Sequence, residues 1–170
     1  MLLTTYHNML SKAIEEAQSI DYIKPYLLKV TDVDDSPDLT DIHPRDREDM
    51  DMRFLSPLIH KDIFKLTSKL IEQDSNIIDA LIIAFAPQTQ LYEHVDTVEL
   101  EPYAKIDWLS VYMPMFVPSI DSSKVGVKVG DIIYDHKETI IFDTQIPHSA
   151  WNWTDDWWVS LRLSVKKEII

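Results

Sequence analysis

The chain has 170 residues, enough for one domain with a sizeable buried core. Its content of 45% hydrophobic and 26% charged residues is typical of a globular protein and excludes an extended disordered one. The 16 basic and 29 acidic residues give a net charge of −13, which disfavours binding to nucleic acid or anionic lipid. The absence of cysteine excludes disulfides, thiol nucleophiles and cysteine-bound zinc.

The first residues of the chain carry neither the basic segment nor the apolar core of a signal peptide. No stretch of apolar residues reaches the length needed to cross a membrane. We therefore expect a cytoplasmic protein that binds neither membranes nor nucleic acid. The sequence does not indicate an oligomeric state.

Residues 1–76 are predicted to be mainly helical. Apolar residues recur at spacings of three and four between Tyr6 and Ile20, which predicts an amphipathic helix that packs on a sheet. A second helix is predicted from Ser56 to about Asp74, with a proline in its first turn. Between them, residues 31–51 are rich in Asp and Glu without periodicity, which predicts an acidic loop. Such a loop is a solvated face, a lid over a site or a contact for a basic partner.

From residue 77 onward, β-branched runs and alternating patterns replace the helical spacing. Strands are predicted at 77–86, 91–97, 104–115, 124–129, 131–135, 138–143, 146–153 and 157–166. Gly130 and Asp131 lie between two of these segments and predict a tight hairpin. Helices followed by many short strands indicate a single domain, residues 1–170, whose strand-rich part at 77–170 is an antiparallel sandwich or barrel.

Two strands carry polar residues on one face. In the last strand the apolar residues alternate with Ser160, Arg162 and Ser164. This polar face either meets water or lines a cavity in which the planar guanidinium of Arg162 could bind a carboxylate. In the strand at 104–115, one face carries Trp108, Ser110 and Tyr112. These residues are either donors to a bound acid or part of a core with satisfied polar tips.

His94 and Asp96 are two residues apart, so in an extended strand both side chains leave the same face. His148 follows another predicted strand and could bring a second imidazole to the same place. Two histidines and one carboxylate on one side of a metal leave positions open, an arrangement that suits non-heme Fe(II) oxygenases. A His-x-Asp pattern alone is weak evidence. The remaining histidines are expected to be solvated: His7, His43, His60 and His136.

The stretch from Ile78 to Val165 resembles the double-stranded β-helix oxygenases that use Fe(II) and 2-oxoglutarate, and most closely the aspartyl/asparaginyl β-hydroxylase family. The features that carry the resemblance are, in order, Ala86-Pro87 before His94, Ile140-Ile141-Phe142-Asp143 before His148, Ser149-Ala150-Trp151-Asn152 after it, and then Arg162. The resemblance implies a mainly β (α+β) protein whose jelly-roll, cupin-like core is flanked by N-terminal helices.

The resemblance also implies roles for single residues. His94, Asp96 and His148 would bind Fe(II), and Arg162 would pair with the distal carboxylate of 2-oxoglutarate. The animal aspartyl hydroxylases have glycine at the position of Asp96, so this chain is closer there to the wider superfamily. Ser164 completes an Arg-x-Ser pattern that is common in these enzymes.

A further arginine and histidine of the family correspond to Ser110 and Tyr112, and neither is retained. We therefore expect hydroxyl groups, chiefly that of Tyr112, to hold the near carboxylate of 2-oxoglutarate. The residues expected to shape a substrate cavity, or else to pack in the core, are Trp108, Tyr92, Tyr134 and Trp151.

By resemblance, the reaction consumes O₂ and 2-oxoglutarate, releases succinate and CO₂, and hydroxylates an amino-acid side chain that is free or part of a peptide or protein. One alternative is a cupin-like protein with a metal used for non-oxidative chemistry. Cupin sites usually gather several histidines on one hairpin, whereas only His94 and Asp96 are adjacent here, and the spacing of Arg162 from His148 also argues against this alternative. Another is a non-catalytic binding protein that uses the acidic loop as its contact surface.

Overall fold

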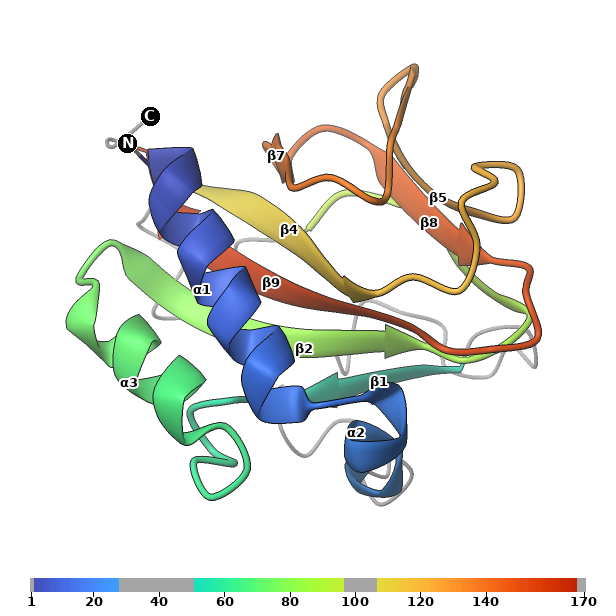
Figure 1. Ribbon diagram of the computed structural model, residues 1–170. Coiled ribbons are helices and arrows are strands. Elements are labelled where there is room, and N and C mark those ends of the chain that lie inside the picture. The colour runs from blue at the N-terminus through green and yellow to red at the C-terminus, as the bar shows by residue number, and fades with distance from the viewer. Residues whose placement is uncertain (1, 28–50, 97–106, 168–170) are drawn as a thin grey trace.

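The computed structural model describes residues 2–27, 51–96 and 107–167 (Figure 1). Three helices lie in these ranges: α1 (Leu2–Ala17), α2 (Ile20–Leu27) and α3 (Lys65–Gln73). Within the same ranges, no helix combines the length and the apolar character that crossing a membrane requires. Apart from Asp51, the predicted acidic loop at 31–51 lies outside the described residues.

Nine strands in the described part of the chain form two antiparallel sheets. The major sheet has the order β1 (Met52–Leu55), β2 (Ile77–Phe85), β9 (Trp158–Lys166), β4 (Trp108–Phe116), β7 (Ile140–Phe142). The minor sheet has the order β3 (Thr89–His94), β8 (His148–Asn152), β5 (Val125–Val129), β6 (Ile132–Tyr134). The chain passes repeatedly from one sheet to the other, which confirms the predicted double-stranded β-helix core.

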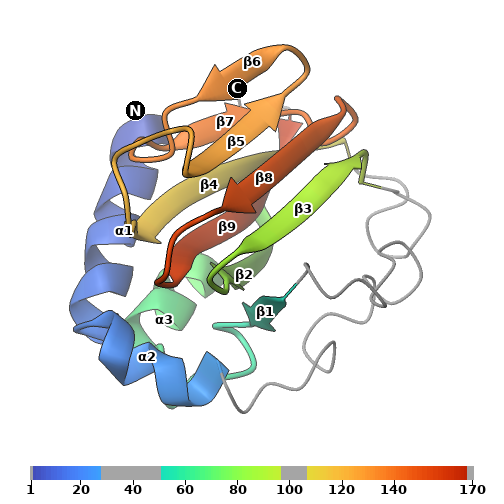
Figure 2. The same ribbon diagram turned by 90° about the vertical axis from the view of Figure 1, so that its right-hand side faces the viewer.

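The helices cover the outer face of the major sheet, and the minor sheet faces its other side (Figures 1 and 2). Alternation along β9 explains this layering, because its odd-numbered residues pack beneath α1 with Tyr6 and Ala13. The neighbouring even-numbered residues, among them Trp158 and Arg162, point between the two sheets. The polar face of the last predicted strand is therefore buried, and Arg162 on this face lines an interior cavity.

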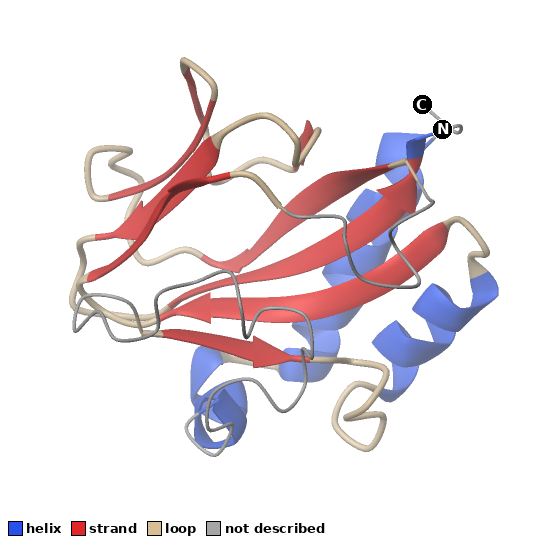
Figure 3. Cartoon of the chain, turned by 180° about the vertical axis from the view of Figure 1, so that it is seen from behind, coloured by secondary structure: helices blue, strands red, loops and turns tan. Residues whose placement is uncertain are grey.

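Three of the connections between the two sheets lie at one end. Phe85 at the end of β2 pairs with Trp158 at the start of β9, and their rings stack with centroids 4.8 Å apart. At this same end, Asn152 pairs with both Thr89 and Val125, so the β2–β3, β4–β5 and β8–β9 connections all lie together (Figure 3). We call this the closed end, and the end where β8 begins at His148 the open end.

The side chain of Asn152 holds the closed end together. Its Nδ2 donates to the carbonyl oxygens of Phe85, Ala86 and Asp156 at 3.1, 3.0 and 2.8 Å. Its Oδ1 accepts from the backbone N–H of Thr154 at 3.3 Å and from the Thr154 hydroxyl at 2.7 Å. Asn152 is completely buried, and its amide links the end of β2 to the β2–β3 and β8–β9 connections.

The predicted hairpin is confirmed, with Gly130 at φ 56° between β5 and β6. The first predicted helix is interrupted between α1 and α2, where Gln18 has a φ of 58°. The second predicted helix, α3, begins at Lys65 and not at Ser56, because the residues before Lys65 form turns. The carboxylate of Glu16 from α1 accepts the N–H of Thr67, in the first turn of α3, at 2.8 Å. A distant side chain therefore determines where this helix starts.

One strand was not predicted, and one histidine was predicted wrongly. Strand β1 lies within the part expected to be helical, and it extends the major sheet by pairing with β2, Phe54 opposite Ile83. The expectation of a solvated His136 was wrong, since this residue is 2% exposed and its Nε2 lies 2.7 Å from the Ser119 carbonyl oxygen.

Candidate metal centre and cofactor cavity

A β-bulge brings His94 to face the interior. Leu91 pairs with Ala150, and the next pair is His94 with His148, so three steps along β3 match two along β8. In a regular strand, residues three apart point to opposite faces. The extra residue is absorbed at the solvent-exposed Tyr92 and Glu93, which leaves both Leu91 and His94 directed inward.

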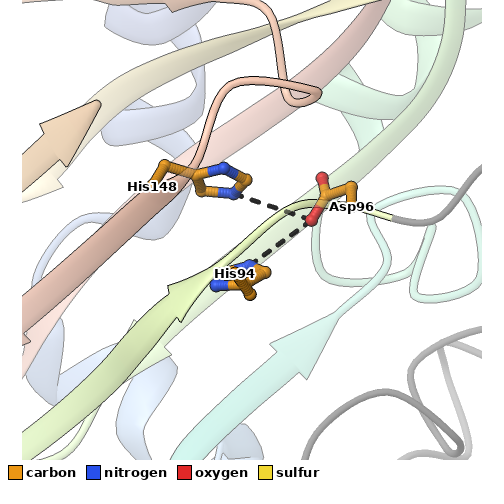
Figure 4. Close-up of side chains that lie close together, drawn as sticks. All are labelled: His94, Asp96 and His148. Carbon is orange, nitrogen blue, oxygen red and sulfur yellow. Dashed lines mark ion pairs between the residues drawn. The ribbon is translucent and has the colours of Figure 1, made fainter. Parts of the chain in front are cut away.

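His94, Asp96 and His148 converge at the open end (Figure 4). The Oδ1 of Asp96 lies 3.4 Å from Nε2 of His94 and 3.6 Å from Nε2 of His148. The two imidazole rings are tilted against each other, with centroids 4.2 Å apart. The potential donor atoms of all three residues lie within 4.8 Å of one another, and they form the one such group of metal-binding side chains among the described residues.

Backbone carbonyl oxygens orient both imidazoles. Nδ1 of His94 lies 2.8 Å from the Tyr92 carbonyl, and Nδ1 of His148 lies 2.9 Å from the Ile146 carbonyl. A carbonyl can only accept, so each Nδ1 must carry the proton when the ring is neutral, and each Nε2 then presents a lone pair. Hydrogen bonds of this kind commonly fix the ring orientation of metal-binding histidines.

The donor set fits a divalent transition metal. Two ligands bound at right angles, each about 2.1 Å from a metal, are separated by about 3 Å. The measured separations from Asp96 to the two imidazoles, 3.4 and 3.6 Å, exceed this by less than 1 Å. Two nitrogen ligands and one oxygen ligand on one side suit Fe(II) with open positions opposite them.

Asp96 is ionised in this environment. Its burial opposes the charged form, but hydrogen bonds that His148 and His94 donate from Nε2 when their rings are protonated, together with the positive charge of Arg162, outweigh that effect. Together they hold the pKa of Asp96 well below its usual range. The carboxylate is therefore available as a metal ligand at neutral pH without prior loss of a proton.

Arg162 reaches the same place from the major sheet. Its Nε donates to the Ser110 hydroxyl at 3.0 Å, and its Nη2 lies 3.3 Å from Oδ2 of Asp96. Its Cζ lies 5.1 Å from the centroid of the Trp108 ring, within the range of a cation–π contact. Tyr112 is directly opposite Arg162 on β4, and burial raises its pKa to about 12, so its hydroxyl remains a donor.

These residues line one cavity between the sheets. Its polar part consists of the three candidate metal ligands together with Ser110, Tyr112, Ser149 and Arg162. The apolar walls come from both sheets: Met52, Phe54, Ile83, Leu91, Val127, Phe142 and Ala150. The walls include two residues of β1, the strand that was not predicted.

Other residues singled out in the sequence lie outside this lining. Ser164 is buried and pairs with Ser110 across β9 and β4, and the Trp108 ring contacts Arg162. Tyr92 is exposed and serves the site through its carbonyl group. Trp151 and Tyr134 also lie outside the cavity lining that the described residues form.

Trp151 lies on the outer face of the minor sheet. Its Nε1 donates to the Ser122 carbonyl at 3.3 Å, and its ring packs over Gly126, which is opposite it on β5. A Cβ atom at Gly126 would lie 2.3 Å from the indole ring, so this packing requires glycine. The aromatic side chain therefore stabilises the sheet on the side away from the cavity.

Several solved structures show a distant likeness to the chain. The TT1209 protein from Thermus thermophilus has 16% identity and a TM-score of 0.38 over 55% of this chain and 76% of its own. The cupin domain of Cnp3 from Schizosaccharomyces pombe has 8% identity and a TM-score of 0.43 over 69% and 66%. A predicted oxalate decarboxylase from Thermotoga maritima has 9% identity and a TM-score of 0.41 over 68% and 80%.

No curated protein sequence matches the chain. The family model described as aspartyl/asparaginyl beta-hydroxylase does match it, over residues 60–168. This match spans the bulged strand, the three candidate ligands and the arginine of β9 in one continuous segment of more than half the chain. The chain therefore belongs to the aspartyl/asparaginyl β-hydroxylase family.

Proposed function

We propose that the protein is an Fe(II)- and 2-oxoglutarate-dependent dioxygenase that hydroxylates an amino-acid side chain, either free or within a peptide or protein. The observation that carries the proposal is the convergence of His94, Asp96 and His148 with Arg162 in one cavity. Membership of a hydroxylase family supports it. Three metal ligands alone would fit many metalloproteins, whereas the additional buried cation suits an anionic co-substrate.

His94, Asp96 and His148 would hold the iron. The Tyr92 and Ile146 carbonyls keep the proton of each imidazole on Nδ1, which directs both Nε2 atoms toward Asp96. The low pKa of Asp96 supplies a carboxylate that is already ionised. The bound iron, with 2-oxoglutarate and O₂, would supply the oxidative chemistry that inserts one oxygen atom into a substrate C–H bond and releases succinate and CO₂.

Arg162 would bind the distal carboxylate of 2-oxoglutarate. Its guanidinium is a planar set of donors that matches a carboxylate, and it is already oriented by Ser110 and by the Trp108 ring. The N–H donors that now face Asp96 would turn to the incoming carboxylate. Tyr112, kept protonated by burial, would donate a hydrogen bond to the co-substrate from the neighbouring strand.

The apolar walls exclude water from the reacting groups. Side chains such as Phe54, Ile83 and Phe142 offer no hydrogen-bonding groups to solvent, so charges within the cavity interact more strongly than in water. This environment strengthens the contact between Arg162 and an anion. It also keeps solvent away from the substrate carbon.

The test is an anaerobic titration of the purified protein with Fe(II) and then 2-oxoglutarate, followed by visible absorption. A weak metal-to-ligand charge-transfer band is expected for the wild type and for the matched control His7→Ala, whose imidazole is exposed on α1. His148→Ala and Arg162→Ala should both lack the band. Succinate release in the presence of a mixture of candidate peptides and amino acids would then measure turnover.

Two results would contradict the proposal. Failure of the wild type to bind Fe(II) would favour a metal-free binding protein of the same fold. Tight Fe(II) binding without any response to 2-oxoglutarate would favour a cupin-like metalloprotein with other chemistry. The band should depend on both Fe(II) and 2-oxoglutarate, so its appearance separates the proposed enzyme from both alternatives.

A further inference from the structure

Asp96 lies beyond the last residue of its strand. Strand β3 ends at His94, so the ladder of hydrogen bonds between β3 and β8 does not extend to Asp96. A metal ligand needs a fixed position, because a loosely held carboxylate loses rotational freedom when it binds. The contacts that fix the backbone of Asp96 therefore bear directly on metal affinity.

Those contacts come from the segment that leads into His148. The backbone N–H of Asp96 donates to the Thr144 carbonyl at 3.1 Å, and the Asp96 carbonyl accepts from the side-chain Nε2 of Gln145 at 2.8 Å. The next residue along, Ile146, orients His148 through its carbonyl. One short segment, residues 143–147, thus contacts two of the three candidate metal ligands.

The segment is itself held in place. The N–H of Gln145 donates to Oδ1 of Asp143 at 2.9 Å, and the N–H of Ile146 donates to the Asp143 carbonyl at 3.0 Å. The other carboxylate oxygen of Asp143 lies 2.9 Å from Nζ of Lys167, just past the end of β9. The segment is therefore connected to both sheets, and Gln145 projects from a fixed turn.

We propose that Gln145 is a positioning residue for the metal centre, which holds the Asp96 backbone so that its carboxylate meets the two imidazoles. This inference rests on the proposed metal site but not on the identity of the co-substrate or the substrate. Gln145 itself is exposed and contributes no metal ligand. Its amide acts on Asp96 through the backbone, as partners outside the ligand set do in metal sites.

The experiment compares Co(II) binding, followed by its visible absorption, in the wild type, Gln145→Met and Gln73→Met. Methionine keeps the length and approximate shape of glutamine but cannot donate to the Asp96 carbonyl. We expect Gln145→Met to bind Co(II) about tenfold more weakly, with an altered absorption spectrum, because the bond is solvent-exposed and outer-shell partners contribute about 10- to 100-fold. Gln73→Met changes an exposed glutamine on α3 and should match the wild type.

Thermal unfolding of the metal-free proteins separates positioning from a general loss of stability. Equal melting temperatures with weaker Co(II) binding support the inference. Unchanged Co(II) affinity and spectrum in Gln145→Met would overturn it while leaving the metal site intact. Absence of Co(II) binding in the wild type would instead overturn the metal site, and the role of Gln145 with it.

Discussion

Arg162 and Asp96 are in contact across the two sheets, with Nη2 of the arginine 3.3 Å from Oδ2 of the aspartate. The residue expected to anchor the co-substrate therefore pairs with a residue expected to bind the metal. Both side chains are largely buried, so their charges interact more strongly than a surface pair. An incoming dicarboxylate would have to compete with Asp96 for the guanidinium. A metal held at Oδ1 of Asp96 would share the carboxylate with Arg162, whose positive charge lies at Oδ2 and opposes that of the metal.

This pairing predicts opposite effects of Arg162→Met on two ligands. Loss of the charged partner should weaken 2-oxoglutarate binding at least about 30-fold, since truncating one member of a buried charged pair costs about 2 kcal/mol or more. Metal binding should be retained or tightened, because a competing cation next to Asp96 is removed. Separate titrations with Co(II) alone and with 2-oxoglutarate on the metal-bound protein measure the two effects. Parallel weakening of both would show that Arg162 only supports the fold of the site.

Stability should fall at high pH because of two buried tyrosines. Burial raises the pKa of Tyr112 to about 12, and burial with the negative charge of Asp74 raises the pKa of Tyr6 to about 12. An unfolded tyrosine ionises near pH 10, so the unfolded chain loses its proton first. The stabilisation is complete below about pH 10 and is lost as pH rises toward 12, by up to roughly 2 kcal/mol per tyrosine.

Urea unfolding of the metal-free protein between about pH 9 and pH 11.5 tests this expectation. Tyr112→Phe and Tyr6→Phe should each reduce the decline of unfolding free energy with pH, and the double variant should reduce it further. A decline of the same steepness in the wild type and all variants would show that other groups cause the alkaline loss of stability.

Replacing Asn152 should lower the free energy of unfolding by removing hydrogen bonds at the closed end. Asn152→Ala leaves the Phe85 and Ala86 carbonyls without their donor, and buried unsatisfied groups cost about 1–3 kcal/mol each. We expect a loss of about 2–4 kcal/mol in the free energy of unfolding. Asn152→Asp should be worse, because it places a negative charge against three carbonyl oxygens. Chemical denaturation measures both losses, with the exposed Asn8→Ala on α1 as the control.

Gly126→Ala should destabilise the minor sheet through Trp151. The added Cβ would lie 2.3 Å from the indole, so the ring has to move and its hydrogen bond to the Ser122 carbonyl is lost. A loss of about 1–2 kcal/mol is expected. In a Trp151→Ala background the same substitution should cost much less, because the clash is gone. Additive losses in this double-mutant cycle would contradict the explanation.

The strand pattern accounts for most of what was predicted correctly. Alternation along 157–166 separated the apolar face beneath the helices from the face of Arg162, although it left open whether that polar face met water or a cavity. Only the position of the minor sheet decides this question, and residues distant in sequence determine that position. The spacing of His94 and Asp96 likewise anticipated a shared direction, while the assembly with His148 depends on the pairing of β3 with β8.

The direction of His94, the packing of Trp151 and the start of α3 could not be predicted from the local sequence. With regular alternation, a buried Leu91 would place the side chain of His94 on the solvent side of β3. The bulge at Tyr92 and Glu93 shifts the alternation by one residue, so that His94 points inward. Trp151 was expected to shape the cavity or to pack in the core, but its ring packs over Gly126. Gly126 belongs to another strand, so the local sequence around Trp151 does not indicate this contact. The predicted start of α3 failed because Glu16, far away in the sequence, caps it.

The two ends of the sandwich are fastened in different ways. Three connections and the buried amide of Asn152 tie the sheets at the closed end, whereas near the open end residues 143–147 join β7 to β8 and Arg162 contacts Asp96. A dicarboxylate that chelates the metal and pairs with Arg162 would add a further contact between the two sheets near the open end. Heat resistance should then increase with the concentration of metal and co-substrate together. Thermal-shift measurements could therefore rank candidate co-substrates before any hydroxylated product has been identified.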